Sequence, residues 1–334
     1  MTVRYRHTLL RAGAFKLDAG SMFGLIPRVV WSRTVPTDDR GRIAVNHNCL
    51  LLERLDDAPA GVALPGPKLI LLEVGTGNKL DEKSREIFSL DGRSILDCLA
   101  EVNCRAEDVQ AVVCSHLHFD HAGGLTRLCR AGETPDWVGP GSSFGAPRGD
   151  LGVKRTFRDA SVVVQRREWH DALANRSVMT RTYFSDHLLP FATGAAPGPL
   201  SRLIDSPPPF TPGLTPDREE RPRAAQEQRE TQVFPGVFVF QTPGHTWGQQ
   251  ATRFTDERGR AIVFTPDVMP TAWHVGQAYS LGYDVEPYTS MVTRGWFLAE
   301  AAARGWTLCL DHEPGNPMRT VKTSGKGWYE LVEA

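Results

Sequence analysis

The chain has 334 residues, of which 41% are hydrophobic and 23% charged, and its formal net charge at pH 7 is -1. This is the composition of a globular protein with a large apolar core, and the near balance of basic and acidic residues argues against nucleic acid as a partner. No apolar stretch is long enough for an export signal or a membrane span, so we expect a cytoplasmic protein with no membrane partner.

Buried strands alternate with helices in the first half of the chain. Short apolar runs bounded by turn residues predict strands at 48–53 (NCLLLE), 68–73 (KLILLE), 109–114 (VQAVVC) and 161–165 (SVVVQ). Apolar residues repeat with helical spacing at 94–99, where Ser94 is a suitable N-cap, and the segment 166–175 also has a helical pattern.

Two segments lack a periodic pattern, at about 132–158 and 192–230. The first contains GPGSSFGAPRGD, and the second contains PPPFTPGLTP followed by the charged run DREERPRAAQEQRE. We expect irregular surface loops at both places. The alternative is that one of them forms a lid or a wall over a binding cavity, because long irregular loops often carry function.

The second half of the chain repeats the mixture of strands and helices. Strands are predicted at 236–241 (GVFVFQ), 250–254 (QATRF), 261–265 (AIVFT) and 307–310 (TLCL). The segment 288–304, rich in Ala and Leu, is predicted to be a helix. Strands and helices mix in both halves, which predicts an α/β protein. The length would permit two domains, but a single α/β domain of this size is also common, and we expect one domain that covers residues 1–334.

The segment SHLHFDHAGG, residues 115–124, directly follows an expected strand. His116 and His118 are two positions apart, so in extended chain both imidazoles point to the same side and can reach one cation. Asp120 and His121 come where the chain turns and suit a second cation, and the two glycines allow close approach of the backbone. The alternative is a set of histidines without metal, but each buried imidazole would then need its own hydrogen-bond partner. We therefore predict metal binding.

Three further candidate ligands also follow expected strands. TPGHT places His245 after the strand GVFVFQ, TPD places Asp267 after AIVFT, and DHEP places His312 after TLCL. Each of these residues alone is a weak signal. Strand ends are where α/β folds gather their sites, so the three side chains are expected to join the first cluster.

The order of these motifs resembles the metallo-β-lactamase-fold hydrolases. The segments that resemble the lactonase-like branch of that superfamily are FKLDAGSMFGLIP, LEVGTGNK, DEKSREIF, VQRREW, PTAWH and the pair Tyr283-Asp284. That branch includes quorum-quenching acyl-homoserine-lactone hydrolases and organophosphate hydrolases, and the resemblance covers nearly the whole chain apart from the two loops. It implies a four-layer αββα sandwich, in which two mixed sheets are flanked by helices.

The resemblance also implies a dinuclear metal site. It assigns His116, His118 and His245 to the first ion, Asp120, His121 and His312 to the second, and Asp267 to a bridging position between them. These nitrogen and oxygen donors suit two divalent ions, with Zn²⁺ as the expected metal and Mn²⁺, Fe²⁺ or Co²⁺ as alternatives. The branch often forms dimers, so the resemblance implies a homodimer as one assembly open to this chain, and the oligomeric state is left open.

The activity implied by the resemblance is hydrolysis of a small-molecule ester or lactone by a hydroxide that bridges two metals. Asp120 is expected to accept or orient a proton. Lactone hydrolases of this branch have a Tyr three positions after the bridging Asp, where this chain has Pro270. We expect Tyr283 or His274 to take that catalytic place. The apolar residues expected to contact the substrate are Met22, Phe23 and Trp273.

Other activities use the same fold. A phosphotriesterase or phosphodiesterase is the first alternative, although few Lys or Arg residues stand near the ligand motifs to bind an anionic phosphoester. An iron-dependent oxidoreductase and a non-catalytic binding protein are the remaining alternatives. The complete set of seven candidate ligands favours a hydrolase over both.

Overall fold

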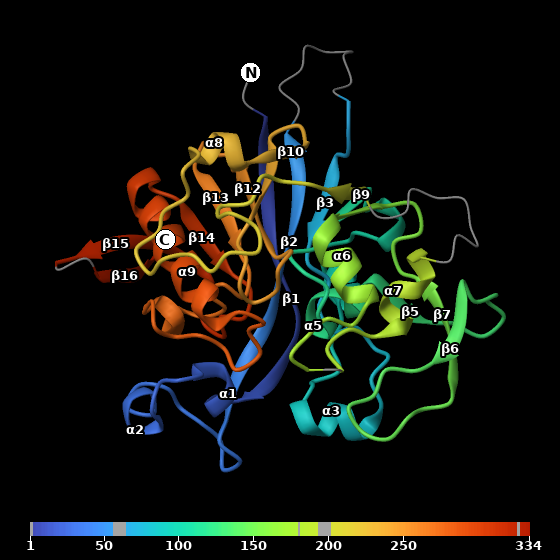
Figure 1. Ribbon diagram of the computed structural model, residues 1–334. Helices are drawn as coiled ribbons and strands as arrows, with labels where there is room; N and C mark the ends of the chain where they lie inside the picture. The colour runs from blue at the N-terminus through green and yellow to red at the C-terminus, as the bar shows by residue number, and fades with distance from the viewer. Residues whose placement is uncertain (1–2, 56–64, 180, 193–201, 326–327) are drawn as a thin grey trace.

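Two mixed β-sheets form the centre of the molecule (Figure 1). The computed structural model describes residues 3–55, 65–179, 181–192, 202–325 and 328–334. The first sheet has the strand order β1 (Arg4–Asp18), β2 (Arg42–Leu55), β3 (Leu69–Leu72), β4 (Ala111–Val113), β8 (Ser161–Gln165) and β9 (Arg202–Ile204). The pairs β1–β2 and β2–β3 are antiparallel, and the remaining pairs of this sheet are parallel.

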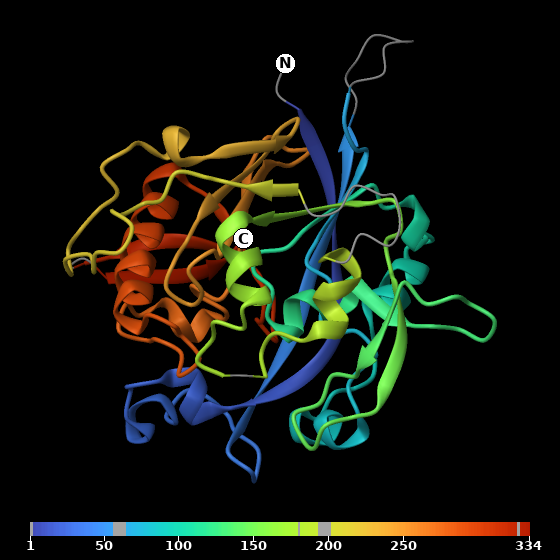
Figure 2. The same ribbon diagram turned by 45° about the vertical axis from the view of Figure 1, so that its right-hand side comes forward.

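The second sheet comes from the second half of the chain. Its strand order is β10 (Thr231–Phe234), β11 (Val237–Gln241), β12 (Gln250–Thr255), β13 (Ala261–Thr265), β14 (Thr307–Leu310), β15 (Met318–Ser324) and β16 (Trp328–Glu333). Only β13 and β14 pair in parallel, with Thr265 opposite Leu310. The long strands β1 and β2 run between the two halves of the molecule in both views (Figure 1, Figure 2).

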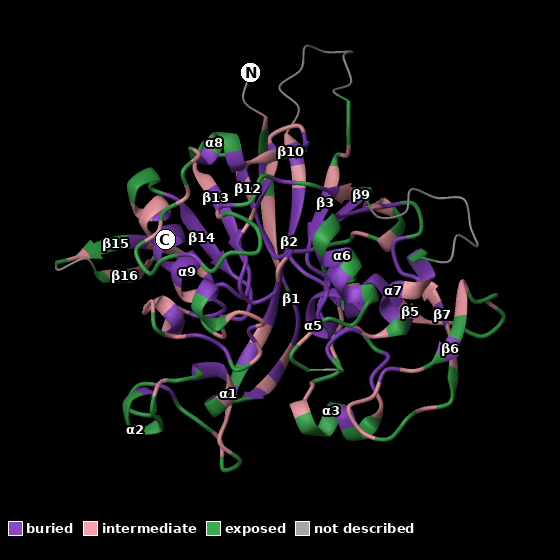
Figure 3. Cartoon of the chain, in the orientation of Figure 1, coloured by how far each residue is buried: buried purple, intermediate pink, exposed green. Residues whose placement is uncertain are grey.

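Helices cover the outer faces of both sheets. Alternation along the strands separates the faces: Leu51 of β2 packs in a cluster with α4 (Ile95–Glu101), α6 (Arg166–Leu173) and α7 (Ser185–Ala192). Its neighbours Leu50 and Leu52 pack against the second sheet. The outer face of that second sheet packs against α9 (Pro287–Arg304). The strands between these layers are largely buried (Figure 3), and the expected four-layer αββα sandwich is confirmed.

Local sequence explains where the main helices begin and end. The backbone N–H of Ser94 donates to the Asp97 carboxylate at 2.8 Å, which caps α4 at its start. Helix α9 begins with Pro287 at its first position and ends before Gly305, which has a left-handed φ of 63°. The short helices and 3₁₀ turns are α1 (Ala19–Phe23), α2 (Arg28–Trp31), α3 (Glu82–Phe88), α5 (Phe119–Ala122), α8 (Gln226–Arg229), η1 (Ala106–Asp108), η2 (Gly123–Leu125) and η3 (Ala272–Val275).

The two segments expected to be irregular differ in structure. The first contains two strands, β6 (Trp137–Pro140) and β7 (Asp150–Arg155), which form a small sheet with β5 (Thr126–Leu128). The expectation of an irregular loop over 132–158 was therefore wrong in part, because its Gly- and Pro-rich stretch is only the turn that connects β6 and β7. In the second segment, residues 193–201 lie outside the described residues, and most of the rest is loop.

Candidate metal centre

The first four candidate ligands follow strand β4. His116 and His118 lie in the extended segment after the strand, and His118 precedes the first turn of α5, which carries Asp120 and His121. All four residues are buried, with at most 8% of the surface of each residue exposed. The extended segment carries His116 and His118, and the helical turn that follows it brings Asp120 and His121 to the same place.

Two glycines after α5 allow the backbone to approach the segment that follows β3. A Cβ on Gly123 would lie 2.0 Å from the carbonyl oxygen of Thr76, and one on Gly124 would lie 2.2 Å from that of Val74. The buried ammonium group of Lys79 donates to the carbonyl oxygens of Gly123 and Thr126. This close packing holds the turn with Asp120 and His121 against the first sheet.

One group of ligand atoms joins the two halves of the chain. Side-chain atoms of His116, His118, His245 and Asp267 lie within 4.8 Å of one another. His245 Nε2 is 3.0 Å from His118 Nδ1 and 3.0 Å from Asp267 Oδ2, and His116 Nε2 is 3.7 Å from the same carboxylate oxygen. This group can hold one divalent ion.

A second group shares the Asp267 carboxylate with the first. It comprises His121, Asp267, Asp311 and His312, again within 4.8 Å of one another. His312 Nε2 is 3.2 Å from His121 Nε2 and 3.4 Å from Asp267 Oδ1. Asp120 lies at its edge, with Oδ2 3.5 Å from His312 Nε2. The seven expected ligands therefore come together, and Asp267 faces both groups.

The chemistry of the side chains suits a cation. Buried Nε2 of His116 and Oδ1 of Asp267 have no hydrogen-bond partner among the described residues. The far ring nitrogens are held in place: His121 Nδ1 by Glu73 at 3.1 Å, His245 Nδ1 by Asp284 at 2.8 Å, and His312 Nδ1 by the carbonyl of Asn46 at 2.9 Å. Such outer partners orient imidazoles towards a metal.

Charge in the cluster is dominated by carboxylates. Burial alone would lower the pKa of His245. The carboxylates of Asp267 and Asp284 outweigh burial and raise that pKa to about 10. Burial likewise opposes the shift of His121, yet Asp120, Asp267 and Glu73 raise its pKa well above the usual value. The side chains thus present negative charge that a divalent cation would balance.

Three buried acids in and around the cluster were missed by the sequence analysis as functional residues. Glu73 has a left-handed φ of 63°, a strained backbone that often marks a functional site. It accepts from His121 and from the backbone N–H of Ser115. Asp284 orients His245 and accepts from the backbone N–H of Leu281 at 3.0 Å. The third, Asp311, precedes His312 in the DHEP segment. The sequence did offer signals for them. Glu73 ends a predicted strand, and Asp284 and Asp311 stand next to the candidate site residues Tyr283 and His312.

Glu168, in helix α6, joins two ligand-bearing segments. Its Oε1 accepts from the backbone N–H of Leu117 at 2.9 Å and from the hydroxyl of Tyr183 at 3.0 Å. Its Oε2 accepts from the Thr246 hydroxyl at 2.6 Å. Leu117 stands between His116 and His118, and Thr246 follows His245, so Glu168 holds together the segments that carry the first ligand group.

A cavity of about 590 Å³ adjoins both ligand groups. His118, Asp120, His245, Asp267 and His312 belong to its lining. Its apolar wall comes from widely separated segments and comprises Leu17, Met22, Ile87, Phe88, Phe119, Phe144, Met179 and Leu281. Because Phe144 lies in the turn after β6, the segment 132–158 forms a wall of this cavity, as the alternative interpretation expected.

The other expected site residues divide between the cavity and the protein interior. Met22 and Tyr283 line the cavity, whereas Phe23, Trp273 and His274 are not part of its lining. His274 is fully buried, and its two ring nitrogens contact the Thr271 hydroxyl and the Met22 carbonyl oxygen, each at 2.8 Å. With both nitrogens engaged and no access to the cavity, His274 supports Met22 and does not meet the substrate.

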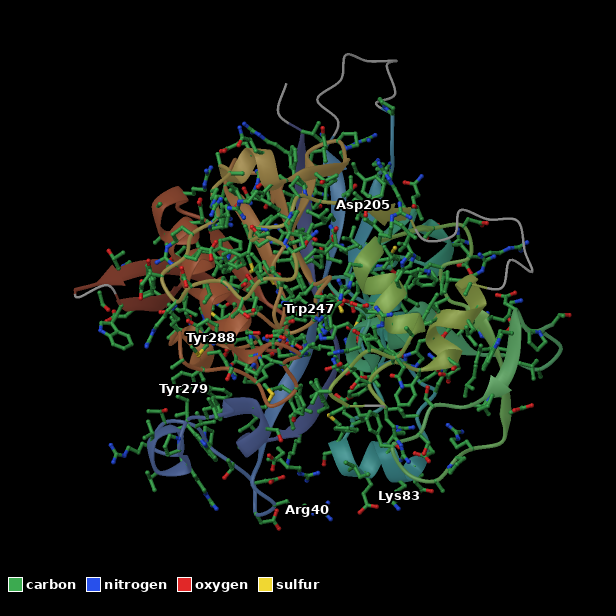
Figure 4. The ribbon with its side chains drawn as sticks, in the orientation of Figure 1. Arg40, Lys83, Asp205, Trp247, Tyr279 and Tyr288 are labelled. Atoms are coloured by element: carbon green, nitrogen blue, oxygen red, sulfur yellow. The ribbon has the colours of Figure 1, made fainter. Side chains whose placement is uncertain are left out.

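A separate cavity of about 400 Å³ lies beside the other long segment. Its lining includes residues 208–214 and Pro216 of the proline-rich stretch, together with Arg167 and Trp247. Trp247 lies near the middle of the molecule in the view of Figure 4, and the Arg167 guanidinium is 5.7 Å from its ring centre. The described part of the segment 192–230 therefore does not line the cavity at the metal cluster.

Comparisons with known proteins agree with this geometry. Residues 62–268 match the family model described as the metallo-beta-lactamase superfamily. A probable metal-dependent hydrolase from Staphylococcus aureus is similar in structure, with a TM-score of 0.70 and 23% identity over 100% of this chain and 99% of that chain. No curated protein sequence matches the chain significantly.

Two further solved structures show the same fold. AidC, a dizinc quorum-quenching lactonase in complex with a product, has a TM-score of 0.65 and 14% identity over 99% of this chain and 98% of its own. The hydrolase AbOPH of the beta lactamase superfamily has a TM-score of 0.65 and 17% identity over 100% of this chain and 97% of its own. Within the described ranges, no helix has both the length and the apolar character needed to cross a bilayer.

Proposed function

This chain belongs to the metallo-beta-lactamase superfamily, and from that premise we propose that it is a dinuclear metal-dependent hydrolase of small-molecule esters or lactones. The observation that carries the proposal is the pair of ligand groups that share Asp267 beside an apolar cavity. The relatives named as lactonases and metal-dependent hydrolases support the same reaction class.

In this proposal His116, His118 and His245 would hold one ion and Asp120, His121 and His312 the other, and the Asp267 carboxylate, which faces both groups, would be shared between them. Zn²⁺ is the expected metal for the histidine-rich first site. When bound, the two ions lower the pKa of a water molecule towards neutrality and polarise the electrophilic carbonyl or phosphoryl group.

The protein's own side chains position the reactants. Asp120, on the cavity lining, orients the attacking water and accepts its proton. Tyr283 also lines the cavity, and burial raises the pKa of its hydroxyl, so it stays protonated at neutral pH. It is therefore suited to donate a hydrogen bond to the leaving oxygen, in place of the Tyr that Pro270 replaces. The apolar wall with Phe88, Phe119 and Phe144 would bind the acyl part of the substrate.

A phosphoester substrate is the second candidate, and one observation favours it. Lys16, Arg40 and Arg42 line the cavity, although they stand far from the ligand motifs in the sequence. Lys16 and Arg42 pair with Asp38, whereas the Arg40 guanidinium has no such partner among the described residues. Arg40 lies at the lower edge of the molecule in Figure 4. The small number of cations near the motifs thus does not disfavour an anionic substrate.

Metal content and turnover can be measured together to test the proposal. Purified protein should contain about two divalent ions per chain and hydrolyse members of a panel of aryl esters, lactones, a neutral aryl phosphotriester and an aryl phosphodiester. The Tyr283→Phe variant should lose kcat/KM on the order of 100-fold, whereas Tyr288→Phe, an exposed Tyr outside the lining, should not. A metal-loaded sample that turns over no member of the panel would contradict the proposal.

A further inference from the structure

Asp311 is a buried carboxylate without partners. Only 2% of the residue is exposed, and neither Oδ1 nor Oδ2 has a hydrogen-bond partner among the described residues. No ion pair involves it within that part of the chain either. Burying a carboxyl group in this way is costly unless something else binds its oxygens.

Three other buried acids near the ligand groups have structural roles and can be compared with Asp311. Glu73 bonds to an imidazole and a backbone N–H, Asp284 does the same, and Glu168 accepts three hydrogen bonds. Each of these side chains has ordinary protein partners for its oxygens. Asp311 differs from all three, so a structural role does not explain it.

The backbone fixes the direction of the Asp311 side chain. Its N–H donates to the Thr265 carbonyl at 3.2 Å, and its carbonyl accepts from the backbone N–H of Asn48 at 2.8 Å. One carboxylate oxygen then lies within 4.8 Å of ligand atoms of His121, Asp267 and His312. Asp120 lines the cavity whereas Asp311 does not, so Asp311 reaches the second group from within the protein interior.

We propose that Asp311 is an additional ligand of the second metal ion, beyond the seven residues already assigned. The second site would then offer three carboxylates and two imidazoles, whereas the first offers three imidazoles and the shared carboxylate. Carboxylate oxygens suit harder ions. The second site is therefore biased towards Mn²⁺ or Fe²⁺, while the first suits Zn²⁺. This inference rests on the dinuclear centre of the proposed function.

Metal binding by the full-length Asp311→Asn variant tests the proposal without an activity assay. Wild-type and variant protein are stripped with a chelator and titrated with Mn²⁺, and bound Mn²⁺ is measured by electron paramagnetic resonance. A second sample is loaded with equimolar Mn²⁺ and Zn²⁺, desalted and subjected to elemental analysis. The control is Glu313→Gln, since Glu313 lies beside His312 but has backbone partners, the N–H groups of Ala272 and Gly315.

The Kd for one Mn²⁺ should rise about 10- to 100-fold in Asp311→Asn, and its bound Mn²⁺:Zn²⁺ ratio should fall, with neither change in Glu313→Gln. The melting temperature of the metal-free variant should equal or exceed that of the metal-free wild type, because the substitution removes a buried carboxylate beside Asp267. Unchanged Mn²⁺ binding, or a metal-free variant that no longer folds, would overturn the inference. Wild-type protein that binds no ions would contradict the proposed function itself.

Discussion

Two buried histidines outside the candidate metal centre are neutral, because burial disfavours the charged imidazole. Burial, followed by the field of Lys79, lowers the pKa of His187 to about 3, and its Nε2 is 3.1 Å from the Ser142 hydroxyl. Burial and Arg294 lower the pKa of His274 to about 3 as well. Neither residue can take up a proton in the folded protein near neutral pH, so the stability of the fold should depend on pH.

The free energy of unfolding should fall as the pH falls below about 6.5, where histidines of the unfolded chain become protonated. The unfolded state then binds protons that folded His187 and His274 do not bind. Each of these histidines therefore lowers the free energy of unfolding by up to about 1.4 kcal/mol for each unit by which the pH falls. Urea unfolding of chelated protein at pH 7.5, 6.5 and 5.5 measures this slope. The slope should be shallower in His187→Gln, and unchanged in His170→Gln, which alters an exposed histidine. Equal slopes in all three proteins would contradict the prediction.

The sequence predicts the candidate ligands but not the residues that orient them. The seven candidate ligands stand in short motifs whose spacing carries the chemistry, and the structure brings all of them together. Glu73 and Asp284 act through contacts between residues about 40 positions or more apart, for example His245 with Asp284, and their places in the sequence do not show which imidazole each one contacts. The position of His274 was likewise undetermined, because the sequence does not show which way its ring points.

At the scale of elements, continuous apolar runs were the reliable signal. Strands such as β3, β4 and β13 are buried on both faces, and their sequences show it directly. Strand β1 was harder to recognise because exposed and buried residues mix along it and Gly13, with a φ of 113°, interrupts its register with β2. The small sheet of β5, β6 and β7 was missed because its strands are short and half exposed.

The turn after α5 depends on a glycine, because there is no room for a side chain at this position. In Gly123→Ala the new Cβ would meet the Thr76 carbonyl oxygen at 2.0 Å, so the backbone must move and the ligands of α5 move with it. We expect a loss of about 1–3 kcal/mol in the free energy of unfolding and weaker metal binding, measured by urea titration and elemental analysis. Gly149→Ala is the matched control, because its Cβ would meet nothing within 4 Å. Similar behaviour of the two variants would show that the contact is unimportant.

At the scale of the whole molecule, the metal cluster connects the two sheets. The segment after β4 belongs to the first sheet, whereas His245, Asp267 and His312 follow strands of the second. Ions bound there would hold both halves together. This geometry supports the proposal that residues 1–334 form one domain.

Removing the ions should therefore destabilise the entire fold. An ion at 100 times its Kd contributes about 2.7 kcal/mol to stability, so chelation should lower the melting temperature by several degrees. Calorimetry with and without chelator measures the shift, and re-addition of metal should reverse it. Both samples should unfold in a single transition. Two separate transitions would argue against one domain, and an unchanged melting temperature would argue against metal binding.

The contact between His121 and His312 joins residues that are 191 positions apart. During synthesis, a nascent polypeptide extended only as far as β13 holds the segment SHLHFDHAGG but lacks His312, which follows β14, so the second ligand group is incomplete until the chain has been made past β14. Contacts between such distant residues form slowly. If the second group binds an ion as proposed, that ion can meet its full set of ligands only after nearly the whole chain has been synthesised.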